Sequence, residues 1–207
     1  MDRDFSSVAF DAGVLGALFY RDPASEEGRP TFRWVCSDGA SGAWTSGQPG
    51  ASDLIVEMGS AIGDEGEERL HKAYNRLFVG PFKLPAPPWG SVYLDPEQVI
   101  FGNETLELRD WMRGNGVELH LPDKEPEDHF GIMLSMFSFA AQSGVPDDQL
   151  EVFLSHHLLP WSGRFLELFE AGADDGFYSA AARLAKVTLD DWMERFGIEP
   201  EERKLYR

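Results

Sequence analysis

The sequence predicts a single all-α domain, a helical bundle that carries one proline-rich aromatic loop. Apolar residues recur at intervals of three and four over most of the 207 residues, which is the spacing of one helix face. Alternating apolar and polar runs, which mark half-buried strands, are nearly absent. No repeat of 20 to 50 residues is visible, so a solenoid is excluded. A chain of this length fits one domain, so we treat residues 1–207 as a unit.

The first half of the chain contains four helical patterns. The first covers residues 5–19 with one apolar face over about four turns. Residues 23–49 are rich in Gly, Ser and Pro and leave room only for a short helix around residues 32–35. Ser52 is a good N-cap for the next helix. Another helical pattern follows and stops at Gly80.

The middle of the chain is less regular. Short apolar pieces at 92–94 and 99–101 flank the turn signal Asp95-Pro96. These pieces either pair as a small hairpin or lie as coil. Asn103 is then expected to cap a helix that ends near Gly114.

The second half is more strongly helical. Pro126 fits the first turn of a helix, where Glu127 and Asp128 would complement the positive end of the helix dipole. Residues 130–141 are apolar on nearly every side, which predicts a central, buried helix. Three further amphipathic patterns follow, at residues 146–159, 160–169 and 177–196.

The charge balance limits the partners of the protein. The chain has 36 acidic and 18 basic residues, a net charge of −18. Nucleic-acid binding requires a basic footprint, and anionic membrane surfaces attract basic segments, so both partners are disfavoured. An acidic surface suits a cationic partner. No apolar run is long enough to span a bilayer, and no export signal is visible, so we expect a cytoplasmic protein.

Motifs of catalysis or metal binding are not found. Cys36 is the single cysteine and has no activating histidine near it in the sequence. His156 and His157 are neighbours on a predicted helix, so their side chains diverge and cannot share one metal. Nucleophile-elbow, zinc-helix and phosphate-loop motifs are missing. We therefore expect no catalytic residue, no metal and no cofactor.

Residues 76–95 form the most distinctive segment, in which a helical pattern stops at Gly80 and a proline-rich loop follows. Its prolines lack an N–H and fix φ, so the loop is stiff and extended. Such a loop could form the floor of a groove for an extended or helical peptide, or could tuck its rings into the core. The loop holds Pro81, Pro85, Pro87 and Pro88, and the rings of Phe82, Trp89 and Tyr93.

A second distinctive segment reads Glu-Pro-Glu-Asp-His-Phe over residues 125–130. A capped helix start explains Glu127 and Asp128 but not His129, because a protonated histidine is unfavourable at a helix N-terminus. The alternative is a compact anionic feature for a guanidinium group. Both interpretations stay open.

Together these segments resemble the TorD/DmsD family of chaperones. The resemblance rests on Arg76-Leu-Phe-Val-Gly-Pro81, on Pro87-Pro-Trp-Gly-Ser-Val-Tyr-Leu-Asp95 and on residues 125–130. It extends to Val14–Tyr20, Leu108–Arg113 and His157–Ser162, and it is weakest between residues 21 and 66. Several spaced motifs in one order are more specific than a single proline-rich loop.

The resemblance implies an all-helical, non-catalytic cytoplasmic chaperone. Such a protein holds the twin-arginine leader peptide of a molybdopterin-dependent reductase, here of the dimethyl sulfoxide reductase type. It delays export until the cofactor is loaded and then hands the leader to the twin-arginine translocase. Carried over by position, the leader-binding residues are Tyr74, Leu77, Phe78, Phe82, Pro88, Trp89, Gly102, Asp128 and His129.

Three positions depart from the family pattern. Tyr74 and Phe82 stand where relatives often carry tryptophan, and Pro96 replaces a basic residue. A wider groove, or one tuned to a different leader, would follow. Two other functions are weighed beside the chaperone: an all-helical structural subunit of a larger complex, and a weak nucleotide hydrolase.

Overall fold

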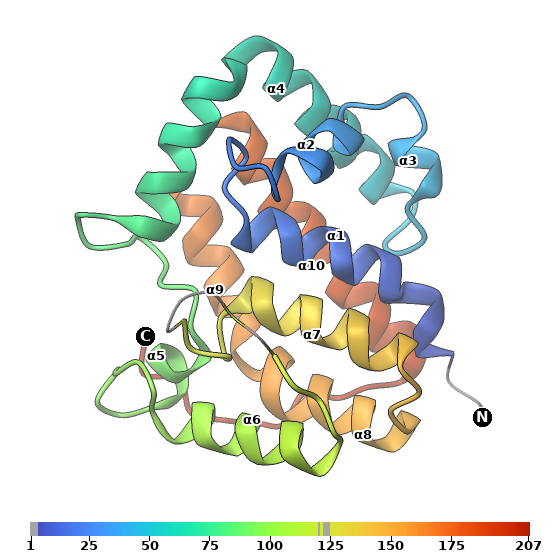
Figure 1. Cartoon of the computed structure of the whole chain (residues 1–207), viewed down its shortest axis with the longest axis vertical. Helices are drawn as coiled ribbons and strands as arrows, with labels where there is room; N and C mark the ends of the chain where they lie inside the picture. Colours follow the sequence, from blue (N-terminus) through green and yellow to red (C-terminus); the bar gives the residue numbers. More distant parts are fainter. Residues whose placement is uncertain (1–3, 120, 122–124) are drawn as a thin grey trace.

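The computed structural model describes residues 4–119, 121 and 125–207, and these residues form an all-helical fold without a β-strand (Figure 1). The predicted fold class is confirmed. The elements in chain order are η1 (Phe5–Val8), α1 (Ala9–Tyr20), α2 (Arg29–Val35), α3 (Ala40–Ala43), α4 (Gly50–Tyr74), η2 (Asn75–Val79), α5 (Gly90–Leu94), α6 (Asn103–Gly114), α7 (Phe130–Gln142), α8 (Asp147–Val152), η3 (Phe153–Leu158), α9 (Leu159–Gly172) and α10 (Gly176–Phe196).

Helix α7 lies at the centre, as its all-round apolar sequence predicts. Most of its side chains are fully buried, and Phe137 contacts the rings of Phe5, Phe153 and Trp192. Three positions differ: Ser135 and Gln142 are exposed, and the Phe139 side chain is 52% exposed. The helix is therefore covered on all but one face.

Helices α1 and α7 run antiparallel in close contact (Figure 1). A Cβ atom on Gly16 would lie 2.8 Å from the carbonyl oxygen of Gly131, and a Cβ on Gly131 would lie 2.8 Å from that of Gly16. Neither position can accept a larger side chain without moving a backbone. The two glycines thus set how closely the helices cross, and α4 and α9 pack on α10 behind them.

Two predicted N-caps are wrong: the N-cap of α4 is Pro49, three residues before Ser52, and the N-cap of α6 lies one residue before Asn103. Helix α4 begins at Gly50, and the Ser52 hydroxyl donates to the side-chain oxygen of Gln48 instead of capping. Helix α6 begins at Asn103, so Gly102 is its N-cap.

The two helical patterns expected before Gly80 are confirmed, because α4 consists of two helices that meet at a kink at Gly66, where φ is +77°. The hairpin alternative for 92–94 and 99–101 is wrong, because residues 90–94 form the short helix α5. Turn residues follow α5 instead of a paired strand.

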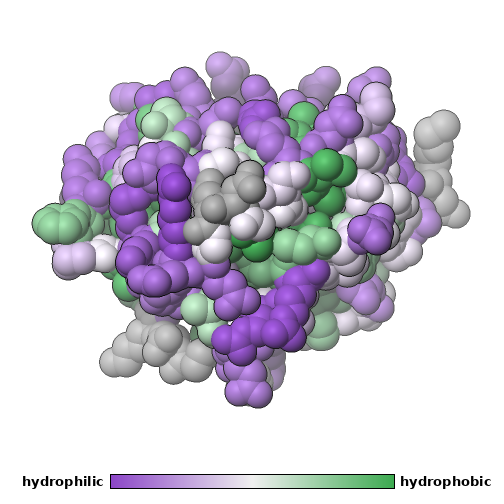
Figure 2. Space-filling model, turned by 90° about the horizontal axis from the view of Figure 1, so that it is seen from above, coloured by the Kyte–Doolittle hydropathy of each residue, from purple (hydrophilic) through white to green (hydrophobic). Residues whose placement is uncertain are grey.

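The face drawn in Figure 2 is largely hydrophilic, with one group of apolar residues near its centre and smaller, separate apolar patches elsewhere. Over the described residues, no helix has the length and apolar character that crossing a membrane requires.

The buried and exposed phenylalanines of α7 give a matched test of the core. Phe137→Ala should lower the free energy of unfolding by about 3–5 kcal/mol, because it removes a fully buried ring and leaves a cavity. Phe139→Ala on the same helix should change it by only about 0.5 kcal/mol. Urea denaturation of both variants measures the difference. Equal losses would contradict the central position of α7.

Candidate functional site

A cavity of about 470 Å³ opens where the end of α1 meets the end of α4, η2, the proline loop and the start of α7. Aromatic rings and carboxylates line it together. The lining residues are Tyr20, Arg21, Asp22, Ser25, Glu27, Tyr74, Phe78, Val79, Trp89, Glu125 and His129. We call this cavity the aromatic acidic cleft.

Trp89 and His129 are held side by side by the backbone. The two residues form an isolated antiparallel bridge, in which Phe130 N donates to Pro88 O at 2.7 Å and Gly90 N donates to Asp128 O at 3.0 Å. Their rings meet edge to face, with centroids 6.1 Å apart. The stiff proline loop is thereby pinned to the start of α7.

His129 is the N-cap of α7. Its Nδ1 accepts a hydrogen bond from Gly131 N at 3.1 Å, so the ring is neutral and its proton lies on Nε2. Burial lowers the pKa of His129 to about 3, so the ring stays uncharged at neutral pH. The predicted helix start at Pro126 is wrong, and Glu127 and Asp128 lie before the helix. A neutral cap also answers why histidine is tolerated at a helix N-terminus.

Asp128 is fully buried and acts inside the protein. Its carboxylate accepts hydrogen bonds from Ser91 N at 2.7 Å and from the Thr105 hydroxyl at 3.1 Å. Burial raises the pKa of this carboxyl, while the bonds from Ser91 and Thr105 oppose the rise. Direct contact of Asp128 with a peptide arginine is therefore ruled out in this conformation. Asp128 instead joins the start of α5, the first turn of α6 and the residue before α7.

The carboxylates of the compact anionic feature expected at residues 125–128 also bind partners within the protein. Glu127 forms a two-oxygen contact with Arg109 Nε, at 2.9 Å to each oxygen. Glu125 Oε1 accepts from Trp89 Nε1 at 2.5 Å and fixes the indole ring beside the cleft. Of the three carboxylates, only Glu125 reaches the cleft wall.

The cleft wall is aromatic because helix ends converge on His129. Its ring centroid lies 5.3 Å from that of Tyr20 and 6.4 Å from that of Phe78. The Tyr74 hydroxyl donates to Tyr20 O at 2.7 Å and ties the end of α4 to the end of α1. Burial raises the pKa of Tyr74, which stays protonated.

The rim of the cleft carries more negative than positive charge. Asp22 and Glu27 come from the segment after α1, and Asp22 pairs with His71 through a 2.8 Å contact to Nδ1. Arg21 is the cationic side chain in the lining, and its guanidinium lies 5.1 Å from the centre of the Tyr20 ring. Three carboxylates, counting Glu125, thus face one guanidinium.

The residues named from the sequence separate into three groups. Tyr74, Phe78, Trp89 and His129 line the cleft. Leu77, Pro88, Gly102 and Asp128 are buried behind or beside it, and a Cβ on Gly102 would lie only 2.8 Å from an Asp95 carboxylate oxygen. Phe82 is 86% exposed at the tip of the loop and is not part of the lining.

The sequence left open whether the loop lines a groove or packs its rings into the core, and the structure shows one ring in each position. Tyr93 is fully buried against Trp161, with ring centroids 5.4 Å apart, whereas Trp89 stays half-buried at the cleft. Sequence reasoning missed Tyr20, Asp22 and Glu27 as lining residues. Tyr20 could have been found, since it directly follows the helical pattern of residues 5–19 and belongs to the segment Val14–Tyr20 that resembles the family. The other two lie in a polar stretch with no distinguishing pattern.

The two adjacent histidines and the single cysteine that the sequence analysis considered do not form a catalytic arrangement in the described residues. His156 contacts Glu107 and Glu201, while His157 contacts Glu104 at 3.0 Å. Burial raises the pKa of the Cys36 thiol, which disfavours the thiolate. Over the described residues, no group of three or more His, Cys, Asp and Glu side chains is placed to hold a metal ion.

Known proteins similar to this chain carry names from one group of chaperones. The family model described as nitrate reductase delta subunit matches residues 46–167. The chain is 41% identical to the Tat proofreading chaperone DmsD of Salmonella typhi over 207 residues, covering 100% of this chain and 98% of that protein. It is 31% identical to the chaperone TorD of Vibrio cholerae over 146 residues, covering 63% and 64%.

A solved structure agrees with the fold. The crystal structure of a redox enzyme maturation protein from Archaeoglobus fulgidus superimposes with a TM-score of 0.55 at 16% identity, over 94% of this chain and 96% of that one. At this identity the match speaks for the fold alone. The full-length sequence identity and the family match lead to one conclusion: this chain belongs to the nitrate reductase delta subunit family, the family of the TorD and DmsD chaperones.

Proposed function

We propose that this protein is a chaperone that binds the twin-arginine leader peptide of a redox enzyme in the aromatic acidic cleft. The observation that carries the proposal is the composition of the cleft, where aromatic rings and carboxylates line one cavity of about 470 Å³. A twin-arginine leader has the matching chemistry, a cationic segment followed by an apolar one. Relatives named Tat proofreading chaperones support the same function.

Arginine recognition would fall to the rim and the ring faces. Carboxylates bind guanidinium groups through short charge-assisted hydrogen bonds, and Asp22 and Glu27 offer such groups. Guanidinium groups also stack on aromatic rings, and Arg21 over Tyr20 already illustrates this contact within the chain. A leader arginine could take the same position over Tyr74 or Trp89.

The apolar segment of the leader would pack against Phe78, Val79 and Trp89. Val79 is 64% exposed and lies directly before the proline loop, so it extends the apolar wall outward from the cleft. The Trp89 ring is already oriented by Glu125 and His129. A rigid ring loses little entropy on binding, which favours affinity.

In this function the protein acts in the cytoplasm and without catalysis. It would bind the leader of a molybdopterin-dependent reductase of the dimethyl sulfoxide reductase type and delay export until the cofactor is loaded. Release to the twin-arginine translocase would follow. Occupying the arginine pair is sufficient for the delay, because a leader buried in the cleft cannot engage another receptor at the same time.

The aromatic half of the cleft is tested by Trp89→Ala. We expect this change to weaken binding of a synthetic twin-arginine leader by about 2 kcal/mol or more, since large rings in desolvated pockets dominate interface energies. Phe82→Ala, which removes an exposed ring of the same loop, should change it by only about 0.5 kcal/mol. Calorimetric titration gives both values. A greater loss in Phe82→Ala would move the site to the loop tip.

The acidic half is tested by Asp22→Asn combined with Glu27→Gln. Affinity should fall, and the loss should shrink as salt is raised, because exposed charge pairs are screened within about 8 Å at physiological ionic strength. A leader with both arginines changed to glutamine should show no difference between the variant and the unchanged protein. A useful control is Glu57→Gln. This change removes a carboxylate of α4 that pairs with Arg183 of α10 and does not line the cleft. If Glu57→Gln weakens binding equally, net charge rather than the cleft explains the effect.

A further inference from the structure

The last residues of the chain form an extended strap that has no role in the aromatic acidic cleft. Residues 198–207 contain no helix and run along α6 to the side of the molecule where α5 lies (Figure 1). Most of the strap side chains are exposed, including Glu202 and Lys204. The buried Ile198 anchors the start of the strap, and a few specific contacts hold the exposed part that follows it.

The principal side-chain contact is an arginine in a buried acidic socket. Arg203 donates to Glu104 Oε2, and its guanidinium lies 3.9 Å from Glu107 Oε2. The Glu104 side chain is only 1% exposed, and its other oxygen lies 3.0 Å from His157 Nδ1. We call Glu104, Glu107 and His157 the arginine socket.

Backbone hydrogen bonds hold the strap on both sides of the socket. Glu201 N donates to Ser155 O at 2.8 Å, and Tyr206 N donates to Tyr93 O at 2.9 Å. Gln98 Nε2 donates to Tyr206 O at 2.8 Å. Main-chain bonds that any sequence can make, combined with one side-chain socket, are the way proteins recognise extended peptides.

We propose that the arginine socket and the backbone groups beside it form a second peptide-binding site, which takes an extended, arginine-bearing segment and is occupied in cis by the strap. The partner is defined by chemistry: a guanidinium group for Glu104, flanked by main chain free to pair with Ser155 and Tyr93. The socket itself does not depend on the proposed function of the cleft.

The chemistry of Glu104 favours an arginine occupant. A buried carboxylate is costly unless it is paired, so loss of Arg203 leaves a position that favours another cation. A guanidinium suits it best, because it is the more weakly hydrated cation and can bond Glu104 and Glu107 together. Of the exposed side chains near Arg203, Glu201 pairs with His156, so an incoming peptide has this ion pair to replace besides the contacts of the socket and the backbone.

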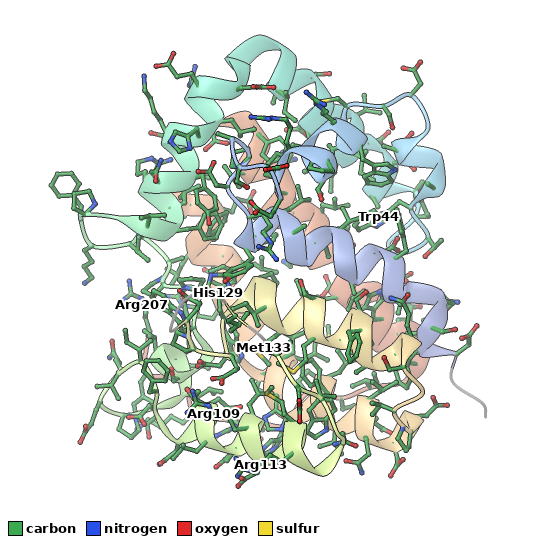
Figure 3. All side chains as sticks on the ribbon, in the orientation of Figure 1. Trp44, Arg109, Arg113, His129, Met133 and Arg207 are labelled. Carbon is green, nitrogen blue, oxygen red and sulfur yellow. The ribbon has the colours of Figure 1, made fainter. Side chains whose placement is uncertain are left out.

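Occupancy of the socket is connected to the proline loop. Arg207 Nη2 lies 3.3 Å from Pro85 O and 3.4 Å from Leu84 O, and Arg164 Nε donates to Arg207 O. Arg207 and His129 lie on the same side of the molecule in Figure 3. Displacing the strap would remove these contacts from the loop that carries Trp89. Because the strap is tethered, a free peptide competes against an effective concentration of about millimolar.

The first experiment uses a peptide with the sequence of residues 199–207, labelled with a fluorophore, and the full-length protein. Arg203→Ala empties the socket while keeping the chain intact. We expect the peptide to bind this variant at least about tenfold more tightly than the unchanged protein, since a hydrogen bond to a charged group has that magnitude. Adding Glu104→Gln should abolish the gain, and so should a peptide with alanine at the position of Arg203. Arg113→Ala, an exposed arginine of α6 paired with Asp110, is the matched control and should bind like the unchanged protein.

The second experiment needs no variant. Amide hydrogen exchange of isotope-labelled, unchanged protein is followed while unlabelled peptide is added at millimolar concentration, about the level that the tether sets. The proposal expects the Glu201 and Tyr206 amides to lose protection while amides of α7 keep it. Undiminished protection, together with equal peptide binding by the unchanged protein and Arg203→Ala, would overturn the proposal. Loss of protection throughout the protein would assign the strap a purely structural role and overturn it as well.

Discussion

The close crossing of α1 and α7 is the contact on which the rest of the structure depends. Gly16 and Gly131 let the two backbones approach until each carbonyl occupies the space of the other's missing side chain. This approach brings the last residue of α1 to the first turn of α7, so that Tyr20 meets His129. A bulkier residue at either glycine would separate the helices and open the wall of the aromatic acidic cleft.

Polar groups buried behind the cleft fix its second wall. Asp128 alone connects three segments through Ser91, Thr105 and its own carbonyl bond with Gly90. Burying a carboxylate costs desolvation free energy, which its hydrogen bonds offset. The bonds of Asp128 also fix where the proline loop meets α7. His129 then caps α7 as a neutral ring, which avoids placing a second buried charge beside Asp128.

Some acidic residues of the protein bind partners within the chain, and others lie at the rim of the cleft. Glu104, Glu127 and Asp128 are committed to partners within the chain, and this commitment holds the strap, α6 and the proline loop in place. Glu27 and Asp22 lie at the cleft rim, where a cationic segment can reach them, although Asp22 also contacts His71. The net charge of −18 therefore overstates the negative charge that a peptide would contact at the cleft. The positions of the individual carboxylates determine that local charge. The strap gives an internal example of an arginine bound by carboxylates, because Arg203 occupies the arginine socket.

Local sequence determined much of this protein. The apolar periodicity established the helical class and the buried position of α7, because a helix without a polar face has to be enclosed. The prolines predicted a stiff loop after Gly80, and the motifs around Trp89 and His129 pointed to the region where the cleft opens. Tertiary structure decided the rest, because it depends on contacts between residues far apart in the chain. It buried Asp128 instead of presenting it, moved the start of α7 from Pro126 to Phe130, and left Phe82 outside the cleft. It also brought Asp22 and Glu27 to the cleft from a polar stretch with no motif, and it placed Tyr20 beside His129 through a glycine crossing that no local pattern reveals.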